Sequence, residues 1–151
     1  MGIMITTSQI DEVRRQLRSL PPPRFVLAHD EKFNRSVIEH GQCAALVMNH
    51  ESHKKDTLRS LELPWNDIIA RIATKNKVAL AFDLSALRAI PSTEQARELA
   101  RIIESIAVCK KTGAPIALLN AYTPQGARAL LRILGASSEQ ARNVSLYTTP
   151  T

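Results

Sequence analysis

Histidines and acidic residues gather directly after one apolar run of the chain. His50 and His53 lie in the segment NHESH, which follows the run CAALVM, and Glu51 and Asp56 are close to them in sequence. Active sites of α/β proteins form in the loops after buried strands, and imidazole and carboxylate groups bind divalent metals. One hypothesis is therefore a small metal-dependent phosphoesterase that uses His50, His53 and Asp83. The segment lacks the H-E-x-x-H pattern of helical zinc sites, and histidines in a polar loop are usually solvated. We therefore predict no metal site and no catalytic residue in this chain.

Asp83 ends the apolar run VALAFD. A carboxylate at the C-terminal end of a strand can be catalytic in a parallel α/β fold. It can equally cap the following turn, LSAL, or pair with a basic neighbour. The chain has neither the G-x-S-x-G elbow of serine hydrolases nor a grouped glycine phosphate loop. Cys43 and Cys109 fall inside apolar patterns, which predicts buried reduced thiols and a cytoplasmic location.

Basic residues occur in four small groups at predicted loops and helix ends. The groups are Lys54, Lys55 and Arg59; Lys75 and Lys77; Lys110 and Lys111; and Arg128 and Arg132. The net charge of +6 favours an anionic partner such as RNA or DNA. Such residues are well placed to contact phosphates without reading bases, although each group alone is typical of a solvated helix end. Aromatic residues make up only 4% of the chain, so base stacking is not expected to dominate binding.

Helices and strands alternate along the whole chain. Apolar runs predict strands at 24–28, 43–48, 78–84, 114–120 and 144–150, and continuous runs of this kind suit a parallel sheet buried on both faces. Helical periodicity predicts helices at 8–20, 30–41, 64–76, 92–113, 123–135 and 137–143, while 49–63 is polar and irregular. The pattern predicts one α/β domain over residues 1–151. A closed eight-unit barrel typically needs ~250 residues, so the sheet is either open and doubly wound or a barrel lacking some units.

Helix ends and faces carry further signals. The expected N-caps are Ser8, Asp30, Thr123, and either Ser92 or Thr93. Pro64 would lie in the first turn of its helix. The spacing of Ala96, Leu99, Ile103, Ile106 and Ala107 predicts that they form the buried stripe of the helix over 92–113.

Several segments, in order along the chain, resemble one known family. They are VIEHGQCAALVM, IIARIATKNKVALAFDLSALRAI, EQARELARIIESIAVCKKTGAPIALLN, TPQGARALLRILG and EQARNVSLYTTP. Together they resemble the thirty-kilodalton protein subunit of archaeal and eukaryotic ribonuclease P, called protein component 3 in archaea. The resemblance covers about residues 33–150 and depends on the collinear set rather than on any one motif. It implies a TIM-like barrel truncated at the N-terminus, because the family's first βα units are missing here.

The resemblance also implies a function. It indicates a non-catalytic cofactor of an endoribonuclease whose catalytic centre lies in the RNA subunit, where Mg²⁺ is expected, so that this chain itself binds no cofactor. The implied partners are the ribonuclease P RNA, the ferredoxin-like protein subunit (component 2) and, through the holoenzyme, precursor tRNA. Asp83 would then be a turn or ion-pair residue. From the resemblance and the charge together, the residues expected to contact phosphate are Lys54, Lys55, Arg59, Lys75, Lys77, Arg128 and Arg132.

The sequence departs from the family at several points. LLNAY replaces a small, serine-rich strand end, Gln125 stands where arginine is common, and the His-x-His motif of the related phosphoesterases is absent. The missing units should leave an exposed sheet edge, which a second copy or the partner subunit would cover. No apolar run approaches the roughly 18 residues of a membrane span. A plain protein-interaction module with an open flavodoxin-like sheet is the remaining hypothesis.

Overall fold

One parallel sheet organises the chain. The computed structural model describes residues 1–50, 63 and 65–150. Its six strands follow the order β1-β2-β3-β4-β5-β6, and every neighbouring pair is parallel. The strands are β1 (Ile3–Ile5), β2 (Arg24–Leu27), β3 (Ala45–Val47), β4 (Ala79–Asp83), β5 (Ile116–Leu119) and β6 (Ser145–Tyr147). The five predicted strands are confirmed, and β1 is an additional strand that the sequence analysis missed.

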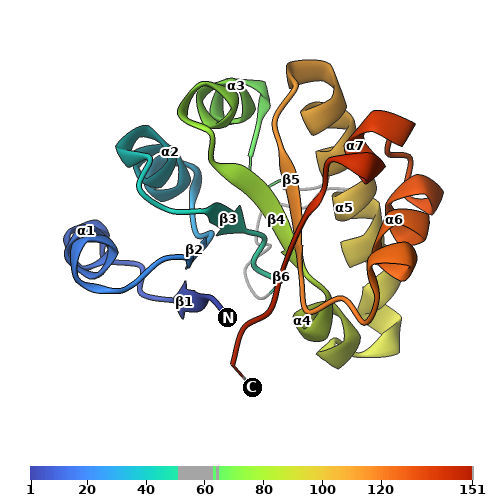
Figure 1. The fold of residues 1–151 in the computed structure, drawn as a ribbon, viewed down its shortest axis with the longest axis horizontal. Coiled ribbons are helices and arrows are strands. Elements are labelled where there is room, and N and C mark those ends of the chain that lie inside the picture. Colours follow the sequence, from blue (N-terminus) through green and yellow to red (C-terminus); the bar gives the residue numbers. More distant parts are fainter. Residues whose placement is uncertain (51–62, 64, 151) are drawn as a thin grey trace.

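The helices connect successive strands and lie outside the curved sheet (Figure 1). They are α1 (Ile10–Ser19), α2 (Glu31–His40), α3 (Asp67–Asn76), α4 (Leu84–Ala89), α5 (Ser92–Thr112), α6 (Pro124–Ile133) and α7 (Ser138–Arg142). A doubly wound sheet reverses its strand order at a switch point, and this sheet does not reverse. The doubly wound alternative is therefore wrong, and the order is that of a barrel.

The sheet curls far enough for its two edges to approach each other. The amide of Gly2, next to β1, donates a hydrogen bond to the carbonyl of Thr148, next to β6, at 2.8 Å. The rings of Phe25 and Tyr147 lie 5.0 Å apart across the interior. A Cβ on Gly2 would lie 2.0 Å from Cε2 of Phe25, so only glycine allows this close approach. We call this junction the seam. No ladder joins β1 to β6 in the described sheet, so the barrel is not closed.

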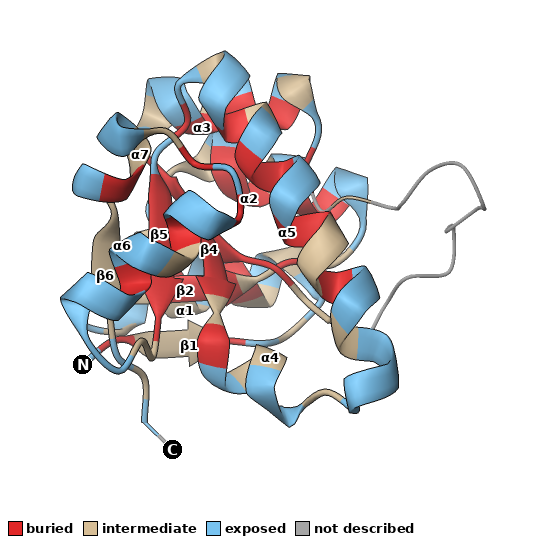
Figure 2. Cartoon of the chain, turned by 90° about the vertical axis from the view of Figure 1, so that its right-hand side faces the viewer, coloured by how far each residue is buried: buried red, intermediate tan, exposed pale blue. Residues whose placement is uncertain are grey.

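The two faces of the sheet carry side chains of different size. Along the central strands, Ala45, Ala79, Ala81 and Ala117 belong to the cluster on the inner face, together with Val47, Leu119 and Phe25. The larger alternate residues, among them Leu46, Leu80, Phe82 and Leu118, pack in the main core with the helices. Figure 2 shows the buried residues concentrated in the strands and on the helix faces toward them. Small inward side chains suit a tightly curled sheet because its interior has little volume to fill.

Two predicted caps are confirmed and two are wrong. The carboxylate of Asp30 accepts from Phe33 N at 2.8 Å, and the hydroxyl of Thr123 accepts from Gly126 N at 2.9 Å. The N-cap of α1 is Gln9 rather than Ser8. The N-cap of α5 is Pro91, which places Ser92 and Thr93 inside the first turn. Helix α3 begins after Asn66, whose side chain accepts from Ile69 N at 2.9 Å; Pro64 lies outside the described residues.

The predicted buried stripe of α5 is mostly wrong. Its buried residues are Glu98, Arg101, Ile102, Ser105, Ile106 and Cys109. Of the predicted stripe only Ile106 is buried; Leu99 is half-buried, and Ala96, Ile103 and Ala107 are exposed. The helix is turned so that two charged residues, Glu98 and Arg101, face inward.

Candidate functional site

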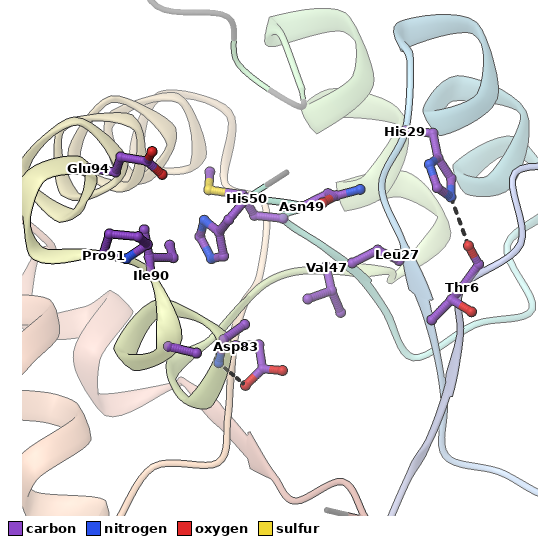
Figure 3. Close-up of a pocket in the computed structure, with 13 residues that line it drawn as sticks. Thr6, Leu27, His29, Val47, Asn49, His50, Asp83, Ile90, Pro91 and Glu94 are labelled. Atoms are coloured by element: carbon purple, nitrogen blue, oxygen red, sulfur yellow. Dashed lines mark hydrogen bonds between the residues drawn. The ribbon is translucent and has the colours of Figure 1, made fainter. Parts of the chain in front are cut away.

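A cavity of about 800 Å³ opens at the end of the sheet where the strands finish. Among the described residues it is lined by Thr6, Leu27, His29, Val47, Met48, Asn49, His50, Asp83, Ala86, Ala89, Ile90, Pro91 and Glu94 (Figure 3). Three neighbouring strands end at this cavity: β2 ends at Leu27, β3 at Val47 and β4 at Asp83. This is the end at which α/β barrels place their active sites. Most of its wall is apolar, with a few polar groups converging on it, as is typical of ligand sites.

Asp83 acts as a structural cap at the floor of the cavity. Its Oδ1 accepts hydrogen bonds from Ser85 N at 3.0 Å, Ser85 Oγ at 2.7 Å and Ala86 N at 3.4 Å. The amide of Asn120 donates to the same oxygen at 2.9 Å. These contacts start α4 and fix the end of β4. Of the alternatives open from sequence, the cap is therefore the role that the geometry gives to Asp83.

His50 lies on the cavity wall and belongs to a buried charged network. Its Nδ1 is 2.7 Å from Oε2 of Glu98, and Nε of Arg101 donates to Oε1 of Glu98 at 2.9 Å. The side chains of His50, Glu98 and Arg101 are only 5%, 6% and 1% exposed. The network joins the loop that follows β3 to the middle of α5. It is the reason that α5 turns its charged face inward and leaves Ile103 outside.

Burying these charged side chains has a large desolvation cost, so the network is a candidate functional feature. Removing charged groups from water costs several kcal/mol per ion before pairing offsets it. A charged residue with a specific partner in a cleft is a candidate for a functional site, although ion-pair networks also serve structure alone. The sequence signal was the pair Glu98 and Arg101, three residues apart on one helix face together with Ile102 and Ile106. Counting only apolar residues selected the neighbouring face and hid this signal.

The structure describes two of the three residues in the metal-site hypothesis, His50 and Asp83. Among the residues that the structure describes, no group of three or more histidine, cysteine, aspartate or glutamate side chains could hold a metal ion. His53, Glu51 and Asp56 lie outside the described residues. The expectation that this chain binds no metal stays a prediction.

The structure brings two of the predicted basic groups together. Lys75 and Lys77 end α3, and Lys110 and Lys111 lie in the last turn of α5. The two helix ends touch, since Thr74 Oγ1 donates to Thr112 O at 3.4 Å. Both ends precede strands, so the lysines lie at the end of the sheet where strands begin, opposite the cavity. We call Lys75, Lys77 and Lys110 the lysine cluster.

The lysine cluster is exposed, and no described carboxylate forms an ion pair with it. Lys111 differs, because its ammonium donates to Asp67 Oδ2 at 2.5 Å and lowers the pKa of that carboxyl. Cations in the last turn of a helix also complement its dipole, so position alone does not establish binding. What distinguishes the cluster is the convergence of two helix ends on one exposed surface.

The other predicted phosphate contacts are dispersed or outside the described residues. Arg128 and Arg132 lie on α6, well apart from α3 in Figure 1. Arg132 donates to Ala136 O at 2.7 Å, which closes the end of its own helix. Lys54, Lys55 and Arg59 lie outside the described residues. The basic groups that the structure describes therefore do not form one surface.

The fold and the two ends just described define a class of protein: a parallel α/β half-barrel of TIM-like type. The sequence matches no protein-family model and no curated protein. The structure is similar to a chain in a cryo-EM structure of archaeal ribonuclease P with mature tRNA, with a TM-score of 0.73 and 21% sequence identity. The match covers 94% of this chain and 62% of that chain, so this chain spans less than two thirds of its neighbour's length. In the described part of the chain, no helix is long and apolar enough to cross a bilayer.

Proposed function

We propose that this chain is a protein subunit of ribonuclease P that binds the RNA subunit and promotes removal of the 5′ leader from precursor tRNA. The observation that carries the proposal is the fold likeness over 94% of the chain to a chain of the archaeal ribonuclease P structure. The collinear sequence segments that resemble component 3 point to the same complex. In this role the protein is a non-catalytic cofactor, and the RNA subunit with its Mg²⁺ breaks the phosphodiester bond.

The lysine cluster is the surface that we assign to RNA. Its ammonium groups are exposed and unpaired among the described residues, so binding to phosphates need not first break a protein ion pair. Lysine contacts to phosphate release condensed counterions and contribute affinity without sequence specificity. Arg128 and Arg132 remain candidates on α6 for a second strand of RNA.

The protein partners follow from the same proposal. The ferredoxin-like subunit, component 2, would bind this chain in the complex, and precursor tRNA would be met through the holoenzyme. The sequence predicts an exposed sheet edge. In the structure the segments next to the two edge strands, β1 and β6, are hydrogen-bonded to each other at the seam, so part of this edge is covered within the chain. Coverage of the remaining edge by the partner subunit or by a second copy stays a prediction.

Reconstitution tests the proposal. Ribonuclease P RNA and the other protein subunits are assembled with and without this chain, and cleavage of precursor tRNA is measured at limiting Mg²⁺. We expect the chain to increase the cleavage rate. Cleavage that is the same in its absence would contradict the proposal.

A charge variant then tests the surface. Lys75→Gln, Lys77→Asn and Lys110→Gln are combined; asparagine is used at position 77 because Lys77 adopts a left-handed conformation, with φ of 57°, which asparagine tolerates. The slope of log affinity for the RNA against log salt should fall by about 2–3. The matched control removes three other exposed cations, with Arg14→Gln, Lys32→Gln and Arg142→Gln. An equal loss in both triple variants would mean that only net charge matters.

A further inference from the structure

We propose that the cavity at the carboxyl ends of the strands binds a small uncharged molecule with hydroxyl groups and a flat apolar ring, of the nucleoside class, and that Nε2 of His50 accepts a hydrogen bond from one of its hydroxyls. This inference concerns the end of the sheet opposite the lysine cluster and does not depend on a role in ribonuclease P.

The contact with Glu98 fixes which nitrogen of the His50 ring donates. The carboxylate of Glu98 is held by Arg101 Nε at 2.9 Å and lies 2.7 Å from His50 Nδ1. A carboxylate has no proton to donate, so Nδ1 carries the proton and donates it. In the neutral imidazole the other nitrogen, Nε2, is then an acceptor. An oriented histidine of this kind has one free lone pair with a defined direction.

That lone pair has no partner among the residues that the structure describes. Nε2 of His50 is buried and accepts no hydrogen bond from any of them, although the ring belongs to the cavity lining. In Figure 3 the ring lies between Ile90 and Pro91 on one side and Val47 on the other. An unpaired buried polar atom is unfavourable, and a donor from a bound molecule would remove this cost. We therefore expect a bound molecule to donate a hydrogen bond to this nitrogen.

The rest of the lining selects the class of ligand. Its titratable side chains are His29, His50, Asp83 and Glu94, and none of the described lining residues is lysine or arginine. Two carboxylates without a cation disfavour phosphates and other anions. Ring-sized apolar wall is supplied by Leu27, Val47, Met48, Ile90 and Pro91. With a volume of about 800 Å³, the cavity is large enough for a nucleoside with its bound water.

A metal ion is a poorer occupant. A divalent cation needs several protein ligands at fixed geometry, and no group of three suitable side chains exists among the described residues. The hydrogen-bonded organic ligand uses the single lone pair that the site offers.

The test follows the His50 ring by NMR. Long-range ¹H–¹⁵N spectra of the imidazole of the whole chain are recorded while adenosine, cytidine, their 5′-monophosphates or Zn²⁺ is added. Without ligand, the spectrum should show a proton on Nδ1 and none on Nε2. A nucleoside should shift the Nε2 resonance of His50. Its monophosphate should bind with a Kd at least about tenfold higher.

One variant isolates the lone pair. In His50→Asn the side-chain amide can still donate to Glu98, but the group at the Nε2 position is gone, so nucleoside affinity should fall at least about tenfold while the circular dichroism spectrum stays unchanged. The matched control is His40→Asn, on α2, outside the cavity lining, which should bind as the wild type does.

Four results would overturn the proposal. They are no shift of the His50 resonances by nucleosides at millimolar concentration, equal affinity of His50→Asn, tighter binding of the monophosphates, and a response to Zn²⁺ alone. The wild-type spectra decide three of these outcomes without any variant, so the proposal stays testable even if His50→Asn unfolds.

Discussion

Asn120 connects three segments of the chain at the end of β5. Its Nδ2 donates to Asp83 Oδ1 at 2.9 Å and to Thr149 Oγ1 at 3.0 Å, and its Oδ1 accepts from Thr149 N at 2.9 Å. Its backbone amide donates to Tyr147 O at 2.8 Å. Asn120 also adopts a left-handed conformation, with φ of 62°. One side chain therefore joins the end of β4 to the segment after β6.

We expect Asn120→Ala to lower the free energy of unfolding by about 3 kcal/mol. A hydrogen bond to the ionised Asp83 contributes about 1.5–3 kcal/mol, and leaving the Thr149 amide without its acceptor costs about 1 kcal/mol. Alanine in the left-handed region costs about 1 kcal/mol more. Partial exposure of the site weakens these hydrogen bonds and brings the expected total to about 3 kcal/mol, just below this sum. For a chain of this size, such a loss lowers Tm by about 6–12 °C.

Two further substitutions separate the contributions. Asn120→Gly loses the same hydrogen bonds but tolerates the left-handed backbone, so it should be about 1 kcal/mol less destabilising than alanine. Asn120→Asp places a second carboxylate against Asp83 and should be the most damaging at pH 7, with partial recovery as acid protonates the pair.

Urea unfolding measures all three variants. The single tryptophan, Trp65, is buried with its ring 5.7 Å from that of Phe82, so its fluorescence reports loss of the core. Asn143→Ala, at the exposed end of α7, is the control and should change stability by less than about 0.5 kcal/mol. If alanine at position 120 is as harmless as this control, or if glycine is worse than alanine, the reasoning is refuted.

Three more predictions concern the core. Ala81→Leu should cost about 1–3 kcal/mol in urea unfolding, because Ala81 is fully buried in the apolar cluster of the inner face and a larger side chain would overpack it. An unchanged midpoint would mean that the interior is loosely filled. Burial raises the pKa of the Cys43 and Cys109 thiols to about 12. Because the unfolded chain releases these protons near pH 9, stability should be constant below pH 9 and fall between pH 9 and 12, by up to about 1.4 kcal/mol per pH unit for each thiol. Cys43→Ala should flatten that fall in a series of urea titrations, and an identical slope would contradict it. Gly2→Ala should lower Tm because its Cβ meets the Phe25 ring; thermal melts equal to the wild type would show that the seam is adaptable.

The sequence predicted the central strands because their apolar runs are long and continuous. It missed β1, since Ile3–Ile5 is a three-residue run among small polar residues and gives no local signal for a strand. This strand depends on pairing with β2, with Met4 opposite Phe25. Such a non-local contact cannot be recognised from the residues of the segment alone. The sequence does not decide the strand order either, because alternation of helices and strands is common to barrels and doubly wound sheets.

The candidate site was predicted only in part. His50 and Asp83 were both singled out, because each follows or ends an apolar run. Their roles depend on partners distant in sequence, since Glu98 is 48 positions from His50 and Asn120 is 37 positions from Asp83. The convergence of Lys75 and Lys77 with Lys110 likewise required knowing that α3 and α5 end side by side.

The methyl-filled inner face isolates the two ends of the molecule from each other. Ala45, Ala81, Ala117 and Phe25 are fully buried in one apolar cluster on this face. Because this cluster lies between the two ends of the strands, a molecule bound in the cavity and a polyanion bound at the lysine cluster would contact different side chains. Substitutions in the cavity lining therefore leave the side chains of the lysine cluster unchanged, and the reverse also holds.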